Sequence, residues 1–143
     1  MTDANGKWLN TAPTLNLAGA KKALEAAEAA AVERDLRLGI AVADAAGNLI
    51  AFVRMDGAPL ISISIAAEKA RTAAQLGCPT RVFQEIVDKG MPSILAAHGL
   101  TPLEGGVPVI VAGAVVGAVA ASGAASADDA FVAQCGADAI SAG

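Results

Sequence analysis

Hydrophobic and polar positions fall into blocks that predict two β-hairpins. The apolar runs 38–42 and 49–53 flank Asp44-Ala-Ala-Gly-Asn48, and Asp, Gly and Asn tolerate the dihedral angles of tight turns. A second pair of apolar runs, at about 107–112 and 115–122, meets at another glycine-containing turn. Valine and isoleucine are frequent in these runs, as pleated, half-buried strands favour.

The segments around the hairpins carry helical signals. Asn16 is a good N-cap, Gly77 is a helix-ending residue, and Asp128 and Asp129 lie in a predicted first turn, where the helix dipole favours acids. The dipole accounts for these two acids without a catalytic role. The predicted helices span about 17–34, 61–76, 80–89 and 126–140, and residues 91–104 are expected to form an irregular crossing with one helical turn.

This order predicts an α+β fold in which an antiparallel sheet of two hairpins is covered by helices. A chain of 143 residues is expected to form a single domain, 1–143, with residues 1–14 as a loose N-terminal arm. Hydrophobic residues make up 55% of the chain and aromatic residues 3%, so alanine and glycine supply much of the core. The high apolar fraction predicts a homo-oligomer, because exposed apolar surface needs a partner.

Charge and cysteine content exclude several classes of protein. The net charge is −4 and no basic residue follows Lys89, which argues against nucleic acid as a partner. Cys78 and Cys135 give neither a metal-binding pair nor a disulfide framework, and the only histidine cannot form a three-histidine zinc site. We therefore expect no metal site and a cytoplasmic protein with reduced thiols. No signal peptide is visible, although a leader removed earlier would leave the same sequence.

One segment resembles a membrane span. Residues 105–127 contain no charged side chain. An uncharged segment of this length could cross a bilayer as a helix. Pro108 and several glycines interrupt it, and valine dominates its bulky positions. Two buried strands explain the segment better, so we expect no membrane partner.

Charged residues follow the first hairpin and occupy the second predicted helix. Arg54 and Asp56 lie where a core strand ends, and as a pair they could hold a substrate carboxylate and move a proton; a structural ion pair is the alternative. Ser62 and Lys69 are seven residues apart and so lie on one side of the helix, in a border stripe of small residues. Lys69 is expected to extend its amine into a cleft, or to be a border lysine with a solvated amine. Folding is expected to survive its loss.

Two further positions complete the candidate site. His98 is the only group with an ordinary pKa near neutrality, so it is the natural proton carrier, or else an ordinary surface residue. Gly105 and Gly106 offer backbone N–H groups for an anion, or serve only as a turn. The catalytic candidates are thus Asp56, Lys69 and His98, and the ligand-binding candidates are Arg54, Ser62, Lys69, Gly105 and Gly106. We expect the strand exit, the Ser62/Lys69 stripe and the glycine turn to converge on one pocket for an anionic small molecule.

Several motifs together resemble one known family. Val42-Ala-Asp-Ala-Ala-Gly-Asn-Leu49, Arg54-Met-Asp-Gly-Ala58, Glu68-Lys-Ala70, Gly105-Gly-Val-Pro108 and Val116-Gly-Ala118 come in the order seen in the GlcG/HbpS family, which includes the C-terminal domain of PduO-type proteins. The resemblance covers about residues 14–141. It implies a profilin-like α+β fold, haem as a cofactor or ligand, and oligomers from dimers to octamers. It gives no iron ligand, because His98 lies in a segment that varies among relatives.

Three functions remain open at this stage. The first is a binding protein for haem or another carboxylate-bearing ligand. The second is a small cofactor-free enzyme, an isomerase, hydratase or lyase, that acts on an organic acid in a catabolic pathway. The third is an accessory module without chemistry of its own.

Overall fold

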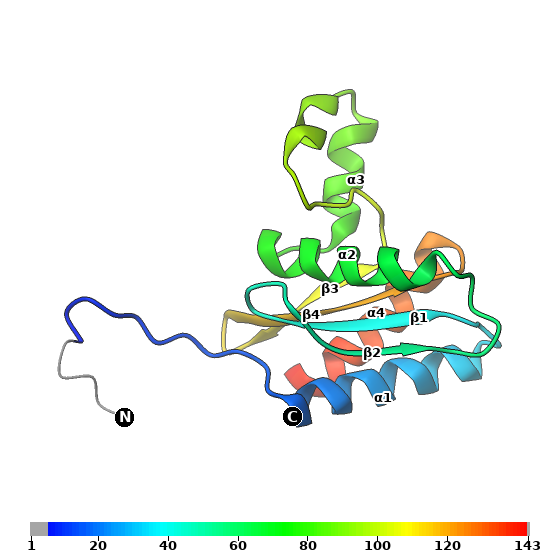
Figure 1. Ribbon diagram of the computed structural model, residues 1–143, viewed down its shortest axis with the longest axis horizontal. Helices are drawn as coiled ribbons and strands as arrows, with labels where there is room; N and C mark the ends of the chain where they lie inside the picture. Colours follow the sequence, from blue (N-terminus) through cyan, green and yellow to red (C-terminus); the bar gives the residue numbers. More distant parts are fainter. Residues whose placement is uncertain (1–5, 143) are drawn as a thin grey trace.

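Four antiparallel strands form the centre of the computed structural model, which describes residues 6–142 (Figure 1). The spatial order of the strands is β2-β1-β4-β3, so each hairpin contributes one central strand and one edge strand. The strands are β1 (Gly39–Asp44), β2 (Leu49–Arg54), β3 (Gly106–Val111) and β4 (Ala114–Ser122). Both predicted hairpins and the α+β class are confirmed.

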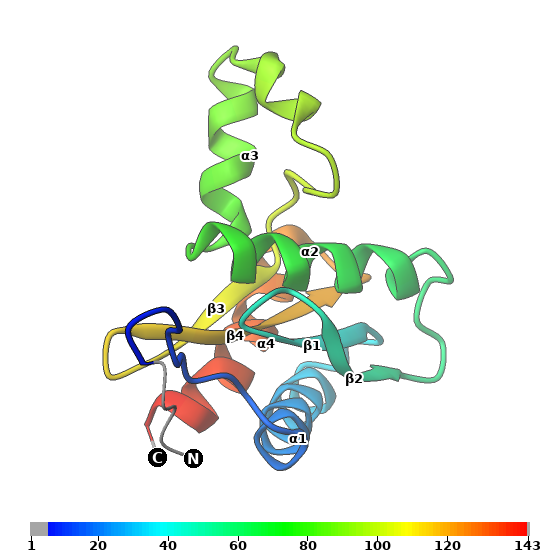
Figure 2. The ribbon, with the colours of Figure 1, turned by 60° about the vertical axis from the view of Figure 1, so that its left-hand side comes forward.

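Helices cover both faces of this sheet (Figures 1 and 2). One helix, α2, lies across one face, while α1 and α4 pack side by side on the other. The helices are α1 (Leu17–Glu33), α2 (Ser62–Leu76), α3 (Thr80–Asp88) and α4 (Ser126–Ser141), with a short 3₁₀ helix, η1, at Pro92–Ala96. Each predicted helix is present, and the predicted helical turn in the 91–104 crossing is η1.

Local residue chemistry explains the turns and helix ends. The Asp44 carboxylate accepts hydrogen bonds from the backbone N–H groups of Ala46 and Asn48, at 3.0 and 2.9 Å, and so closes the first hairpin. The second hairpin turns at Ala112 and Gly113, whose φ angles of 50° and 79° are typical of a type I′ turn. Asn16 caps α1 through a 2.8 Å bond from the Gly19 N–H to its side chain, as predicted.

The uncharged run 105–127 forms β3, β4 and their turn. Pro108 lies in β3, an edge strand, where its missing N–H removes no bond to a second neighbour. Within residues 6–142, no helix is both long and apolar enough to span a bilayer. The sequence prediction of two strands for this run is confirmed.

Alanine dominates the core between the sheet and the paired helices. Five alanines of α1 are buried, and they pack with the strands and with α4. At Gly136 the two helices approach so closely that an added Cβ would lie 2.8 Å from the Ala23 carbonyl oxygen. The near absence of aromatic residues thus corresponds to a core closed by short backbone distances.

The buried face of α2 differs from the sequence prediction. Ser62 and Lys69, expected in a border stripe of small residues, are buried against the sheet together with Ala66 and Ala73, and Thr72 is buried too. The reason is glycine in the sheet: a Cβ on Gly39 would meet the Ser62 hydroxyl at 2.8 Å, and one on Gly106 would meet the Lys69 backbone. The strands therefore approach the helix along its small-residue stripe. An alanine-rich helix gives little hydrophobic contrast from which to read its orientation.

The segment between α2 and β3 projects from the body as an arm (Figure 2). Phe83 is buried at its base, and Thr101 connects the irregular segment that returns from the arm to α2. The Thr101 N–H donates to the Thr72 hydroxyl at 2.8 Å, and the Thr101 hydroxyl donates to Glu68 at 2.8 Å. At the other end of the chain, residues 6–14 run as an extended N-terminal segment, and the first five residues of the predicted arm lie outside the described residues.

Candidate functional site

A groove of about 460 Å³ lies between α3, the start of β3 and α4. We call it the α3–α4 groove. Its volume falls in the range of small-molecule sites, roughly 300–1,000 Å³. Its lining residues are Pro79, Arg81, Val82, Glu104, Gly105, Gly106, Val107, Ala127, Ala130, Phe131 and Gln134.

The walls of the groove are mainly apolar, with a cation among them. Val82 on α3 and Phe131 on α4 are both partly exposed, which is costly for large apolar side chains unless something covers them. Arg81 contacts Glu85 through Nε at 3.2 Å, which leaves the donors on its two Nη atoms for other partners. Outside the groove, the guanidinium of Arg34 lies 3.4 Å from the centre of the Phe131 ring and pairs with Asp128 at 3.1 Å. The groove can therefore hold an apolar body with an acidic group.

Gly105 and Gly106, which the sequence predicted as ligand-binding residues, line one side of the groove, but their backbone groups form hydrogen bonds within the protein. The Gly106 N–H donates to the Thr80 hydroxyl at 3.0 Å, and the Gly105 carbonyl accepts from the Ala121 N–H at 3.0 Å. The expectation of an open Gly106 amide for an anion is therefore wrong. These two residues provide a close-packed floor.

A buried ion pair lies directly behind this floor. The Lys69 ammonium donates to the Asp129 carboxylate at 3.1 Å and to the Ala121 carbonyl at 3.0 Å, and only 3% of Lys69 is exposed. The other Asp129 oxygen accepts from the Ala124 N–H at 3.0 Å. Burial raises the pKa of Asp129 above 3.8, against the opposing effect of the Lys69 charge. The predictions that Lys69 extends into an open cleft and that it lies outside the core are both wrong.

The other predicted residues lie elsewhere. Arg54 ends β2 and Gly106 begins β3, so three strand spacings, about 14 Å, separate these two edge strands. Within residues 6–142 neither Arg54 nor Asp56 forms an ion pair, which removes the structural pair as their explanation. Ser62 is fully buried, and its hydroxyl has no hydrogen-bond partner in the described part of the chain.

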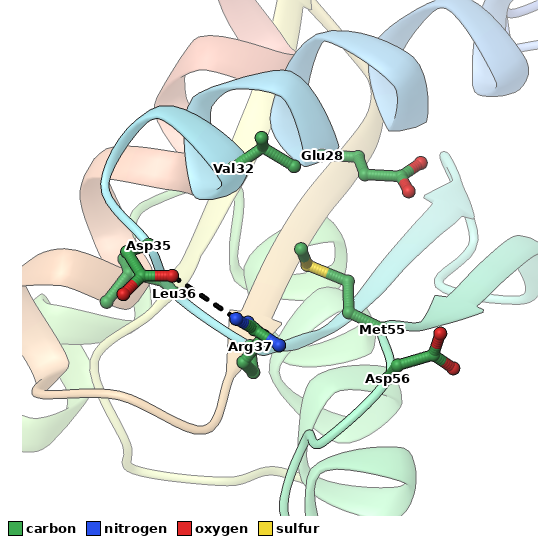
Figure 3. Close-up of a pocket in the computed structure, with 7 residues that line it drawn as sticks. All are labelled: Glu28, Val32, Asp35, Leu36, Arg37, Met55 and Asp56. Atoms are coloured by element: carbon green, nitrogen blue, oxygen red, sulfur yellow. Dashed lines mark hydrogen bonds and ion pairs between the residues drawn. The ribbon is translucent and has the colours of Figure 1, made fainter.

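Asp56 lines a second, smaller cavity of about 300 Å³ at the opposite edge of the sheet (Figure 3). Figure 3 shows Met55 lying across this cavity from Val32, with Arg37 paired to Asp35 at 3.3 Å. Several carboxylates and one guanidinium border it, and all are open to water. Of the predicted residues, Gly105 and Gly106 line one cavity and Asp56 lines the other.

His98 is exposed in the loop after η1. The neighbouring Gly99 lies against Arg71, since a Cβ there would be 3.2 Å from the Arg71 guanidinium carbon. His98 lines neither of the two cavities described above.

Comparison with known proteins shows to which family the chain belongs. The family model described as "Haem degrading protein HbpS-like" matches residues 15–138. The chain belongs to the HbpS-like family. The matched span contains every residue of the α3–α4 groove and of the ion pair behind it.

Individual relatives of this HbpS-like chain support the same assignment. Protein GlcG of Escherichia coli is 42% identical over 99 residues, which cover 69% of this chain and 74% of GlcG. The crystal structure of HbpS superposes with a TM-score of 0.89 at 33% identity, covering 97% of this chain and 99% of that one. The structure of a PduOC–haem complex gives a TM-score of 0.79 at 25% identity, covering 89% and 95%. The family inferred from the sequence motifs is confirmed.

Asp129 is the residue of this HbpS-like site that sequence reasoning missed. Its place in the first turn of α4 was predicted, and the helix dipole was a sufficient explanation for it. The ion pair joins positions 60 residues apart in sequence, so no local spacing could connect Asp129 to Lys69. The available signal was the motif Glu68-Lys-Ala70, which places a lysine among alanines that would otherwise form a buried stripe.

Proposed function

We propose that this HbpS-like chain binds a planar, largely apolar organic acid of the haem type in the α3–α4 groove. The observation that carries the proposal is the groove itself, with apolar walls, a floor of two glycines and the Arg81 guanidinium among its lining residues. Glycines allow a flat ligand to lie close to the backbone, and a guanidinium suits a carboxylate.

The names of the relatives support this class of ligand. The family description refers to haem degradation, and the PduOC structure is a complex with haem. These words describe those proteins. They favour a tetrapyrrole as the first ligand to test on this chain.

The residues of the groove fit one part of haem better than another. Val82, Val107 and Phe131 suit the macrocycle, and Arg81 suits a carboxylate. Among the residues that line the groove there is no histidine or cysteine, and the side-chain oxygens of Glu104 and Gln134 are the remaining polar groups. Haem would bring a redox-active iron, while the chain would bind the ring, hold its carboxylate and shield one face from water. We therefore attribute the affinity of the groove for haem to its contacts with the ring and the ring's carboxylates, and not to the iron.

Titration with haemin and with metal-free protoporphyrin IX tests the proposal. Because the ring and carboxylates provide the contacts, both probes are expected to bind with similar dissociation constants. Phe131→Ala and Arg81→Gln are expected to weaken both, by about 1–3 kcal/mol for the lost charge-assisted bond of Arg81. Arg37→Gln, at the smaller cavity, is the matched control and should bind normally. Binding that needs iron and is lost in His98→Ala, with Phe131→Ala unaffected, would contradict the proposal.

The enzyme alternative is less well supported by the same geometry. Its three candidate groups are dispersed: Asp56 lines the smaller cavity, His98 lies in an exposed loop, and Lys69 is held in a buried ion pair. General acid–base catalysis needs its groups within hydrogen-bond reach of one substrate. A binding role therefore has the stronger case.

A further inference from the structure

The buried Lys69–Asp129 pair lies directly against the floor of the groove. A Cβ on Gly105 would lie 2.6 Å from the Lys69 amine and 3.0 Å from the Asp129 Cβ, and a Cβ on Gly106 would clash with the Lys69 carbonyl. Both residues of the floor, Gly105 and Gly106, therefore pack against Lys69. Gly105 also adopts φ +134°, a conformation that other residues rarely take.

The same pair fixes the α4 wall. Asp129 lies between Ala127 and Ala130, which both line the groove, and its carboxylate holds the Ala124 N–H just before the helix begins. Lys69 in turn holds the Ala121 carbonyl, while the Ala121 N–H binds the Gly105 carbonyl. One ammonium and one carboxylate therefore connect α2, the end of β4, the start of α4 and the floor.

Stability alone is a weak reason for such a pair. Two charges removed from water lose hydration that their mutual attraction only partly restores, and well-packed apolar residues of similar size often stabilise a protein equally well. What apolar residues cannot supply is a set of directed hydrogen bonds that fixes several backbone segments at once.

We propose that Lys69 and Asp129 are positioning residues that set the shape of the α3–α4 groove and thereby its affinity for ligand. Neither side chain needs to touch the ligand, because each acts through the backbone of Gly105–Gly106 and the first turn of α4. The inference rests on the proposed function for its ligand, although the effect on the floor can be observed without one.

The test uses the full chain with two variants. Lys69→Met/Asp129→Leu removes both charges at similar volume, and Asp129→Glu keeps the pair but lengthens it by one methylene. The matched control is Asp35→Asn/Arg37→Gln, which removes an exposed pair away from the groove. The measurements are melting temperature, amide chemical shifts of Gly105 and Gly106, and the dissociation constant of protoporphyrin IX.

Both variants are expected to fold, to shift the two glycine amides and to bind the probe about tenfold or more weakly, as loss of supporting contacts does at metal sites. The control should change none of the three. Folded variants that bind as tightly as the wild type would overturn the inference and leave the proposed function intact. A wild-type protein that binds no probe would overturn the proposed function, and the glycine amide shifts would then decide the inference. Unchanged shifts in both variants would contradict the inference. It would also be contradicted if the double variant failed to fold while Asp129→Glu folded and kept wild-type glycine shifts.

Discussion

The two edges of the sheet carry the same kinds of residue in opposite settings. At the β3 edge, Lys69 and Asp129 are buried, paired and hydrogen-bonded to backbone. At the β2 edge, Arg54 and Asp56 are exposed, and neither forms an ion pair within residues 6–142. Each edge has one basic residue and one aspartate, and the sequence alone does not show which of them are buried. Their energetic roles differ because burial decides how much a charge interacts with its neighbours.

The glycines repeat this contrast. At the β3 edge, Gly105 has three atoms of other residues within 3.0 Å of the position where a Cβ would lie. At the β2 edge, Gly57 also has a positive φ, 83°, but the nearest such atom belongs to the flexible Arg37 side chain at 3.7 Å. One glycine is required for space and backbone conformation, and the other for conformation alone.

Single charge removals should show the largest difference between the edges. Lys69→Ala leaves the Asp129 carboxylate buried without its cation, so we expect the free energy of unfolding to fall by about 3–5 kcal/mol. Arg54→Ala removes an exposed side chain and should change it by no more than about 0.5 kcal/mol. Urea denaturation of both variants measures the two values. Equal effects would mean that the contrast between the edges is wrong.

Alanine at the two glycines gives the next largest difference. Gly57→Ala should cost about 1–3 kcal/mol, which is the usual strain of an L-residue at such a backbone conformation. Gly105→Ala carries this strain and also pushes a methyl group into packed atoms, which adds about 1–3 kcal/mol. Denaturation midpoints at constant slope would report the difference. A Gly105→Ala variant as stable as Gly57→Ala would show that the floor yields easily.

The sequence predicted the elements well because their signals are local. Asn16, Gly77 and the Asp44–Asn48 turn each act through bonds to residues within a few positions, and the hairpins follow from runs of apolar residues. The motif order then indicated the family, which the comparisons confirm. Gly105 and Gly106 were predicted as ligand-binding residues for their backbone N–H groups, but the Thr80 hydroxyl accepts the hydrogen bond of the Gly106 N–H.

The candidate site was harder to predict because it depends on packing between distant elements. The sheet order separates Arg54 from Gly106, and nothing local to either hairpin specifies that order. The rotation of α2, which buries Lys69, depends on glycines at positions 39 and 106 of the sheet. Val82 and Phe131 lie on two helices that are far apart in the sequence, so their shared groove gave no local signal.

We expect self-association to change the stability of the fold less than the substitutions above. The oligomeric state can be measured directly. Several large apolar side chains are exposed, with Trp8 at 76% and Leu60 at 75%. We expect a homo-oligomer that covers part of this surface, because large exposed apolar patches are rare on monomers. Sedimentation velocity at micromolar concentration should give a mass at least twice the 14.0 kDa of one chain. A single species at 14.0 kDa would contradict the prediction.

The pH dependence of Asp129 is the finest test of the contrast between the edges. Burial raises the pKa of Asp129 above 3.8, so the folded protein keeps this proton at pH values where the unfolded chain has lost it. The stability that this group contributes is therefore complete below 3.8 and declines as the pH rises through its folded pKa. Asp129→Asn lacks this titration, while all other carboxylates are common to both proteins. The unfolding free energy of the wild type minus that of Asp129→Asn should thus fall with rising pH and then level off. The comparison covers pH 3.5 to 7. A difference for Asp129 that rises over this range would show that attraction to Lys69 outweighs the cost of burial, and that the β3 edge is held mainly by charge.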